Sequence, residues 1–517
     1  MNCIKKVLVN CNIYCKYKGK YLFIVLLPIV SAAQEIEKSY EEKKRNYYFS
    51  PSISVRQEFT NNAKLDKSNK NGSLTQLIPG IRWIGNGANI KGFADYSLTA
   101  SVDSEGVQRH YVRNRLNANA IVEVVEQLAF FDISGSISTQ PISAFGNPII
   151  DSRPNSNSAE VKNYQISPYI IGSVGDNFNY EARYSVQEIK SGAENIGNSQ
   201  FQKIRMNLES PVSGKTFRWS ALASYENSDF DYRRSISTGT LRGALIYGMT
   251  PQIVFSLIGG GESTDQISPK KETHSIIGLG AQWRPSQQTK ISASGERRYF
   301  GNAHNIILEH NTGKILLRYT DIKGISNGLG GSSAISGSVF DLLNGFYTQI
   351  EPDPVLRTKL VLNEIERLGM TSETQVFKDF LRSTNTLKRT QRLSFIILGK
   401  RNTVTLSAYK VIDNKIDETL NTKDDFERNE NISQKGLSLL MSHRLNFNTA
   451  LFSNIDLRKN SGTSPGLKNT LLSVKLGINK NLSRRTNIGV QLNRSLVDQG
   501  IGRYGESSVM GTMTHRF

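Results

Sequence analysis

The amino-acid sequence predicts an all-β protein, a single transmembrane antiparallel up-and-down β-barrel of about 22 strands (range roughly 18–24) with a short helical loop insert. Three observations predict this fold. Apolar and polar residues alternate from Pro51 to the last residue, short connections take turns with long polar ones, and the chain ends in phenylalanine. Because successive strand side chains point to opposite faces, alternation gives a sheet with one apolar and one polar surface. A barrel wall between lipid and a watery lumen has these two surfaces, whereas a secreted β-sandwich or β-solenoid is the alternative for the same pattern.

The N-terminal residues 1–33 are interpreted as a secretory signal peptide. A lysine-rich region precedes the short apolar run Tyr21–Val30, and Ser31-Ala32-Ala33 supplies the small residues of a cleavage site. Ten apolar residues are too few to cross a bilayer as a helix. All three cysteines, Cys3, Cys11 and Cys15, lie in this segment. The mature chain therefore has no disulfide and no thiolate metal site, as suits an exported protein.

The composition narrows the class of the mature chain further. Residues 34–48 form a polar leader, and no later apolar run is long enough for a membrane-spanning helix. For a membrane protein, only a barrel remains, because half of each strand is then polar. The net charge is +19, of which five charges are signal-peptide lysines. For an exported protein this charge favours outer-membrane lipid or anionic glycans as partners, and no nucleic acid is expected.

The hairpin from Arg113 to Thr139 shows the pattern most clearly. Leu116, Ala118, Ala120 and Val122 alternate with polar residues, a turn follows near 123–127, and the second arm alternates again. Similar arms recur from residue 49 to 517, which is taken as the barrel. The predicted long connections lie near residues 60–72, 142–160, 189–199, 261–272, 412–433 and 459–467. Outer-membrane barrels have this asymmetry of short periplasmic turns and long extracellular loops.

Residues 323–387 interrupt the alternation. A Gly/Ser-rich run is followed by a predicted helix with Asp353 as its cap, Pro354 at its first position and Gly369 as its stop. Leu356, Leu360 and Ile365 are expected to form its apolar stripe. A possible capping box from Ser372 to Gln375 predicts a second helix that runs to Arg382. Strand parity places this insert on the long-loop side, either as a cap over the mouth or as a constriction folded into the lumen.

The chain end predicts how the barrel is inserted. Phe517, with Met513 and Val509 on the same strand face, is similar to the C-terminal signal that the barrel assembly machinery reads, although His515 departs from the usual apolar residue. The expected location is therefore the cell outer membrane of a Gram-negative bacterium, after signal-peptide cleavage.

The stretches SISVRQEFTNN, LNANAIVEVVEQLAFFDISGSIS, YEARYSV and GERRYFGN resemble a known family. The chain is similar, from about residue 49 to Phe517, to the outer-membrane β-barrel proteins associated with the PEP-CTERM/exosortase system. Genes of that family accompany exopolysaccharide loci. The resemblance therefore implies an outer-membrane location and a link to exopolysaccharide export components, and it assigns no functional residue.

The sequence contains no convincing catalytic or metal-binding constellation. Gly324 to Gly328 matches G-x-S-x-G, but that motif requires a sharp strand-to-helix turn of a parallel sheet, and here it lies in a Gly/Ser-rich run. The six histidines show no metal-ligand spacing. We therefore expect no enzyme, no cofactor and no metal. A barrel hydrolase is the least favoured reading.

The leading hypothesis is a porin-like or export channel linked to exopolysaccharide or PEP-CTERM sorting, and the alternative is a non-conducting structural or anchoring barrel. A receptor of this size would need a plug domain in its lumen. Only the short polar leader precedes the first strand, so an N-terminal plug is not expected. The strand register predicts a set of lumen-facing basic residues that would favour anions: Arg82, Arg113, Arg115, Arg183, Lys203, Arg205, Arg218, Lys290, Arg298 and Lys475. Pairing of these charges with acids on neighbouring strands is the competing interpretation.

Overall fold

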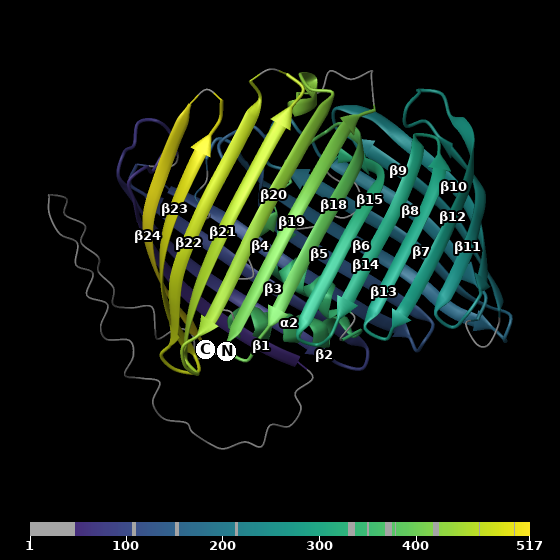
Figure 1. Ribbon diagram of the computed structural model, residues 1–517, viewed down its shortest axis with the longest axis horizontal. Helices are drawn as coiled ribbons and strands as arrows, with labels where there is room; N and C mark the ends of the chain where they lie inside the picture. The colour runs from purple at the N-terminus through teal and green to yellow at the C-terminus, as the bar shows by residue number, and fades with distance from the viewer. Residues whose placement is uncertain are drawn as a thin grey trace, which may run out of the picture. The chain divides into compact units, whose positions relative to one another are not determined.

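The protein is a closed 22-stranded antiparallel β-barrel (Figure 1), which confirms the predicted fold class and strand number. The computed structural model describes residues 47–517 except 106–109, 150–152, 154, 212–215, 329–336, 349–350, 368–374, 378, 417–422, 465 and 501. The predicted signal peptide and residues 34–46 of the predicted leader lie outside the described residues. The first strand begins at Tyr47, so the last two residues assigned to the leader belong to the barrel.

Each strand of the barrel pairs with its neighbours in the chain. The wall strands are β1 (Tyr47–Thr60), β2 (Gly72–Asn86), β3 (Ile90–Asp103), β4 (His110–Val125), β5 (Ala129–Pro141), β6 (Ser158–Val174), β7 (Phe178–Ser191), β8 (Ser199–Glu209), β9 (Phe217–Phe230), β10 (Arg233–Gly248), β11 (Ile253–Thr264), β12 (Glu272–Ser286), β13 (Thr289–Arg298), β14 (Gly301–Asn311), β15 (Ile315–Asn327), β18 (Asn385–Leu398), β19 (Asn402–Lys415), β20 (Asn431–Arg444), β21 (Thr449–Gly462), β22 (Lys468–Asn481), β23 (Thr486–Asp498) and β24 (Arg503–Arg516). Pairing of β1 with β24, from Ser52↔Arg516 to Thr60↔Ser508, closes the wall. Closure satisfies the edge-strand hydrogen bonds, as a membrane-spanning sheet requires.

The connection between β15 and β18 contains β16 (Gly337–Ser338), α1 (Val339–Tyr347), α2 (Pro354–Arg367) and β17 (Gln375–Phe377). A 3₁₀ turn, Asp425–Glu427, lies in the β19–β20 loop. β15 nevertheless pairs directly with β18, residue for residue from Ile315↔Ile397 to Asn327↔Asn385. The wall is therefore complete without the insert.

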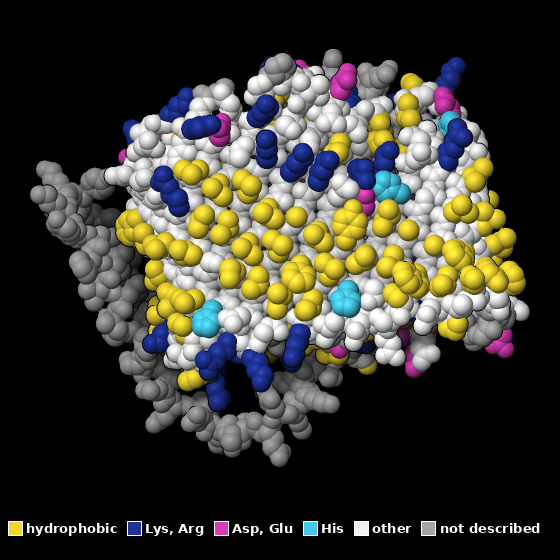
Figure 2. Space-filling view, in the orientation of Figure 1, with side chains coloured by type: hydrophobic (Ala, Val, Ile, Leu, Met, Phe, Trp, Pro, Cys, Tyr) yellow, Lys and Arg dark blue, Asp and Glu magenta, His cyan; other side chains and the backbone are white. Residues whose placement is uncertain are grey.

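The outer surface carries the apolar face of the alternating strands. Figure 2 shows a horizontal band of apolar side chains with Lys and Arg side chains above and below it. Exposed members of the band include Leu241, Leu279 and Ile277, each more than 60% exposed. Trp83, Trp219 and Trp283 all lie on this face near the short-turn end of their strands. Such a band with aromatic residues at its edge is the surface that lipid chains contact. No helix in the described residues is long and apolar enough to cross a membrane.

The two ends of the barrel differ, as predicted. The short-turn end carries connections of two to four residues at most of its turns, for example 175–177 and 399–401. The opposite end, called here the loop end, carries long connections at 61–71, 142–157 and 416–430 and the insert. Three connections there are nevertheless short, at 231–232, 299–300 and 499–502, so the predicted alternation of loop lengths is not strict.

Candidate functional site: a lumen crossed by two chain segments

The insert between β15 and β18 folds into the lumen, and we call residues 328–384 the plug. It leaves the wall after Asn327 at the loop end, whereas its helices pack against wall residues at the short-turn end. These contacts include Leu316, the second residue of β15, and Ile396, near the end of β18. Figure 1 shows α2 low in the barrel, near the end at which β1 begins and β24 ends. Of the two predicted placements, the constriction in the lumen is therefore the one observed.

The helices of the plug form a hydrophobic core with two parts of the wall. Val339, Phe340, Leu343, Phe346, Val361, Leu362 and Ile365 of the helices are buried in one cluster with Leu316, Ile396 and Leu440 of the wall. Phe93 of β3 lies on another part of the wall, and its ring centroid is 5.8 Å from that of Phe340. Each buried side chain of this size stabilises by roughly 1.5–3 kcal/mol relative to exposure. The helices therefore bridge the β2–β3 and β15–β18 walls.

α2 begins as the sequence predicts, but its apolar stripe differs. The Asp353 carboxylate accepts hydrogen bonds from the backbone N–H groups of Val355 (2.8 Å) and Leu356 (3.0 Å), which caps the helix. Burial raises the pKa of Asp353, but these two N–H groups and Lys91 outweigh burial and lower it. Leu356 and Leu360 are about 40% exposed and so do not form the buried stripe. The buried face of α2 is made by Val355, Thr358, Val361, Leu362 and Ile365, a spacing of three to four residues that fits one side of a helix.

Two further expectations for the insert need correction. The predicted helix from Ser372 to Arg382 does not form, because Gln375–Phe377 is a strand that pairs with Gly337–Ser338. Ser372 and the predicted stop Gly369 lie outside the described residues. Residues 323–327 and 385–387, assigned to the insert, belong to β15 and β18.

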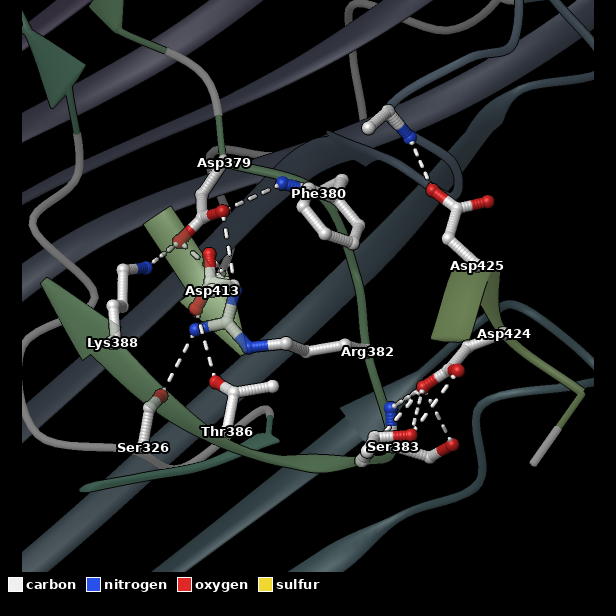
Figure 3. Close-up of polar contacts among 12 residues, drawn as sticks. Ser326, Asp379, Phe380, Arg382, Ser383, Thr386, Lys388, Asp413, Asp424 and Asp425 are labelled. Atoms are coloured by element: carbon white, nitrogen blue, oxygen red, sulfur yellow. Dashed lines mark hydrogen bonds and ion pairs between the residues drawn. The ribbon is translucent and has the colours of Figure 1, made fainter. Parts of the chain in front are cut away.

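The return segment of the plug is held by a buried ionic cluster, which we call the clasp (Figure 3). The Arg382 guanidinium is 3.7 Å from the Asp413 carboxylate of β19 and 3.3 Å from the Asp379 carboxylate, and it donates to the Ser326 hydroxyl at 2.9 Å. Lys388 of β18 contacts Asp379 at 2.5 Å. The side chains of Arg382 and Asp413 are 5% and 0% exposed. A buried ion pair is held strongly by its partners, because either charge alone would be costly to bury.

The protonation state of the clasp follows from these contacts. Burial raises the pKa of Asp379, but Lys388 and Arg382 outweigh burial and lower it to about 2. Burial lowers the pKa of Arg382, but Asp413 and Asp379 outweigh burial and raise it. Asp379 and Arg382 are therefore both charged at neutral pH.

Asp424 and Asp425, in the β19–β20 loop, tie the plug to a second segment. Asp424 accepts hydrogen bonds from the backbone N–H groups of Ser383 (2.8 Å) and Thr384 (3.0 Å) in the return segment. Asp425 accepts from the Ser143 hydroxyl and from the Ala144 N–H, both at 2.7 Å. Burial raises the pKa of Asp425. Ser143 and Ala144 begin the β5–β6 connection, residues 142–157, which we call the inner loop.

The inner loop crosses the upper lumen to distant strands. Asn460 of β21 donates to the Ala144 carbonyl at 2.6 Å, and Asn469 of β22 donates to the Gly146 carbonyl at 2.8 Å. Further along, Arg153 is 3.6 Å from Glu58 of β1 and 3.4 Å from Asp103 of β3. All three of these charged side chains are at most 3% exposed. The loop thus spans from β5 to the seam where the barrel closes.

The two lumen segments also touch each other. The Leu381 N–H donates to the Pro141 carbonyl at 2.9 Å, and Phe380 packs with Ala144 and Phe426. A cavity of about 50 Å³ lies between the inner loop, Phe380 and β19–β22. Ligand pockets typically measure about 300–1,000 Å³. This cavity has room for a few water molecules, so it is not a substrate site.

All ten basic residues predicted to face the lumen lie on the strand face opposite the exposed apolar side chains. Arg82 pairs with Asp95 at 2.7 Å, Arg183 with Asp132 at 3.4 Å, and Lys203 with Glu226 at 2.8 Å, and Arg298 pairs with Glu262. Arg82 and Lys203 thus pair with acids on the neighbouring strand, as the competing interpretation expects, whereas Arg183 and Arg298 pair with acids one strand further along the wall, on β5 and β11. Arg183 and Arg205 are direct cross-strand neighbours, whereas the others are spread over β2, β4, β8, β9, β13 and β22.

The G-x-S-x-G match and the terminal Phe517 belong to the barrel wall. Ser326 of the G-x-S-x-G match lies in β15, not in a loop, and its hydroxyl contacts Arg382. Among the described residues no three His, Cys, Asp or Glu side chains gather as a metal site would require. The Phe517 N–H donates to the Pro51 carbonyl at 3.0 Å, so the terminal residue extends the β1–β24 seam.

No protein-family model matches the sequence, and no curated protein matches it. Among solved structures, the chain is similar to the FrpB iron transporter of Neisseria meningitidis, with a TM-score of 0.48, 9% identity and coverage of 92% of this chain and 81% of that one. It is also similar to a variant of the ferric enterobactin receptor PfeA of Pseudomonas aeruginosa, with a TM-score of 0.48, 9% identity and coverage of 91% and 80%. The siderophore receptor PirA of Acinetobacter baumannii is similar with a TM-score of 0.47, 8% identity and coverage of 90% of this chain and 80% of that one. At such low identity these likenesses assign no ligand and no residue role to this chain.

Proposed function

We propose that this protein is an outer-membrane β-barrel that works as a gated channel, closed at rest by its own plug and inner loop. The observation that carries the proposal is the path of the plug, which enters from the loop end and reaches the short-turn end. An open porin needs a continuous aqueous lumen, whereas here two segments cross it. The apolar band, the tryptophans at its edge and the terminal Phe517 support the membrane location.

Two features indicate that the plug can move. β15 and β18 pair along their whole length, so displacement of the plug breaks no hydrogen bond of the wall. At the loop end the plug is held by the charged and polar groups of the clasp and of Asp424, which water can solvate once they separate, and by two buried apolar side chains, Phe380 and Leu381. A segment held at its two ends by separate sets of contacts, beside a wall that is complete without it, is suited to a two-state element.

We further propose that the transported molecule is anionic and that export components for an exopolysaccharide act with the channel. The basic side chains of the inner face, Arg113 and Arg115 on β4 among them, support an anionic substrate. The exopolysaccharide context rests on the family resemblance alone. Insertion by the barrel assembly machinery is proposed from the C-terminal Phe517.

A non-conducting anchoring barrel is the second candidate, and the same crossed lumen favours it. Conductance in a planar bilayer separates the two functions. We expect wild type to show rare openings. Replacing plug residues 329–381 by a short Gly/Ser linker should make the pore permanently open, because the wall is complete without them. Absence of current from the deletion variant, with a folded barrel, would favour the anchor.

A cross-link tests whether the plug itself is the gate. Phe93→Cys together with Phe340→Cys, joined by a short bismaleimide, should abolish openings, because the two rings lie 5.8 Å apart between wall and plug. The three native cysteines lie in the predicted signal peptide, so the labelling is specific to the introduced pair. Each single-cysteine variant treated with the same reagent is the control. Openings that persist in the cross-linked protein would exclude the plug as the gate.

A further inference from the structure

We infer that the outer face of β19–β21 binds the phosphorylated headgroup of a lipid in the outer leaflet, through a ladder of Lys410, Lys435 and Lys459. The register makes these lysines direct neighbours, with Lys410 opposite Lys435 and Lys435 opposite Lys459. All three are exposed. The inference rests on the membrane-spanning barrel of the proposed function and not on transport.

The ladder lies directly above the apolar band. Two residues nearer the short-turn end, the same strands present Ala408, Leu437 and Leu457, which are opposite one another in the register. Leu437 and Leu457 are 46% and 42% exposed on the outer surface. One such step along a strand is about 7 Å. The ammonium groups therefore lie just beyond the hydrocarbon, at the level of lipid headgroups.

The charge pattern of this row is unusual. Like charges directly opposite each other in an antiparallel sheet destabilise it, yet the row continues with Gln391 on one side and Thr470 on the other, neither of them acidic. None of the three lysines forms an ion pair with another described residue. Because neighbouring strands are about 4.8 Å apart, three ammonium groups face outward within about 10 Å. An anion bound from outside would offset this repulsion.

The far wall at the same end of the barrel has a different pattern. On β6, Lys162 is 3.4 Å from Glu160, and on β7, Lys190 is 2.9 Å from Glu188. There each outward lysine has its own carboxylate two residues away. Lys162 and Lys190 are also opposite each other in the register, but their carboxylates offset the repulsion between them, whereas the three lysines of the ladder have no such partner among the described residues.

The surroundings strengthen the positive field on this side. Figure 2 shows a row of Lys and Arg side chains just above the apolar band on this face. The acid that ends the row, Asp321, is already neutralised, because Arg389 holds it at 2.6 Å and His304 at 2.9 Å. Arg494 and Lys468, on β23 and β22, are also exposed. Anionic headgroups carrying phosphate are therefore attracted and held at one sector of the circumference.

The test measures binding of lipid A with two phosphates to the detergent-purified full-length mature protein by native mass spectrometry. Lys435→Gln with Lys459→Gln should weaken binding about 25-fold, because each basic side chain near an anionic surface contributes about fivefold. Lys162→Gln with Lys190→Gln, which removes the same charge from the paired lysines, should change it less than about twofold. Monophosphorylated lipid A should bind more weakly than the bisphosphorylated lipid to wild type.

Two outcomes would overturn the inference. Equal binding by the two double variants would remove the ladder as the site. Displacement of the lipid by an equal concentration of inorganic phosphate would assign the ladder to a soluble anion. Because binding is measured in detergent, a barrel that conducts nothing leaves the result unaffected, and a heat-modifiable gel shift of each variant establishes that the barrel is folded.

Discussion

Removing the central cation of the clasp should open the channel. Arg382 contacts Asp413, Asp379 and Ser326 and is almost fully buried. Arg382→Gln keeps a polar side chain of similar length but removes the charge, so Asp413 stays in its 0% exposed site without its cation and keeps the hydrogen bond that the Thr386 hydroxyl donates at 2.9 Å. Breaking one partner of a buried ion pair costs about 3–5 kcal/mol.

That cost falls on the closed state alone, because the open state has already separated the return segment from the wall. With about 1.4 kcal/mol for each factor of ten, the ratio of open to closed channels should rise by roughly two to three and a half orders of magnitude. Single-channel recording in a planar bilayer measures this ratio directly. A wild type that opens rarely should become a variant that is open most of the time.

The matched control is Arg494→Gln. Arg494 lies on the outer face of β23, is exposed and donates to the Ser507 hydroxyl at 2.6 Å. Removing it changes the net charge equally but leaves the clasp intact, so the open fraction should stay at the wild-type level. If Arg382→Gln and Arg494→Gln give the same open fraction in folded barrels, the clasp does not hold the closed state.

Two other predictions concern acid and ions. The pKa of Asp379 is lowered to about 2 from 3.8, so the clasp is fully formed above pH 3.8 and weakens as the pH falls towards 2. Wild-type openings should increase over this pH interval, whereas Asp379→Asn should show a raised open fraction that does not change over it. A wild-type open fraction that is independent of pH would show that Asp379 does not hold the closed state. The plug-deleted barrel should prefer anions. Arg113→Glu with Arg115→Glu should shift its reversal potential in a salt gradient towards cation preference, because both side chains are on the inner face of β4. The control is the outward pair Arg494→Glu with Lys468→Glu, and an unshifted potential in the β4 variant would show that these arginines do not line the ion path.

The wall of the barrel could be predicted from the sequence because its signal is repeated in every strand. Alternation fixes which residues face outward, and the loop parity fixes which end carries the insert. The α2 N-terminus was also predictable, since Asp353 caps the helix by accepting local hydrogen bonds and Pro354 suits its first position. Phe517 at the end of an alternating segment predicts the closing strand, which pairs with β1.

The contacts of the plug and the inner loop could not be predicted in the same way because they join residues that are far apart in the sequence. Arg382 meets Asp413 and Ser326, and Arg153 meets Glu58 and Asp103, and each pair joins residues from different elements of the chain. None of these residues lies in a local pattern that distinguishes it from other charged residues of the chain. The predicted second helix failed for a related reason, since pairing of Gln375–Phe377 with Gly337–Ser338 overrides a local capping signal.

The contacts between the plug and the inner loop imply that the two segments move together. Leu381 is bonded to Pro141, Phe380 packs on Ala144, and Asp425 binds Ser143 and Ala144 while its neighbour Asp424 binds Ser383. Displacing the return segment would remove partners from the start of the inner loop, whereas the far part of that loop stays fixed by Arg153 at β1 and β3. Opening should therefore begin over β18–β20, next to the clasp, and leave the seam between β1 and β24 covered. The path through the open channel would then lie on the side of the lumen that the plug leaves, next to β18–β20.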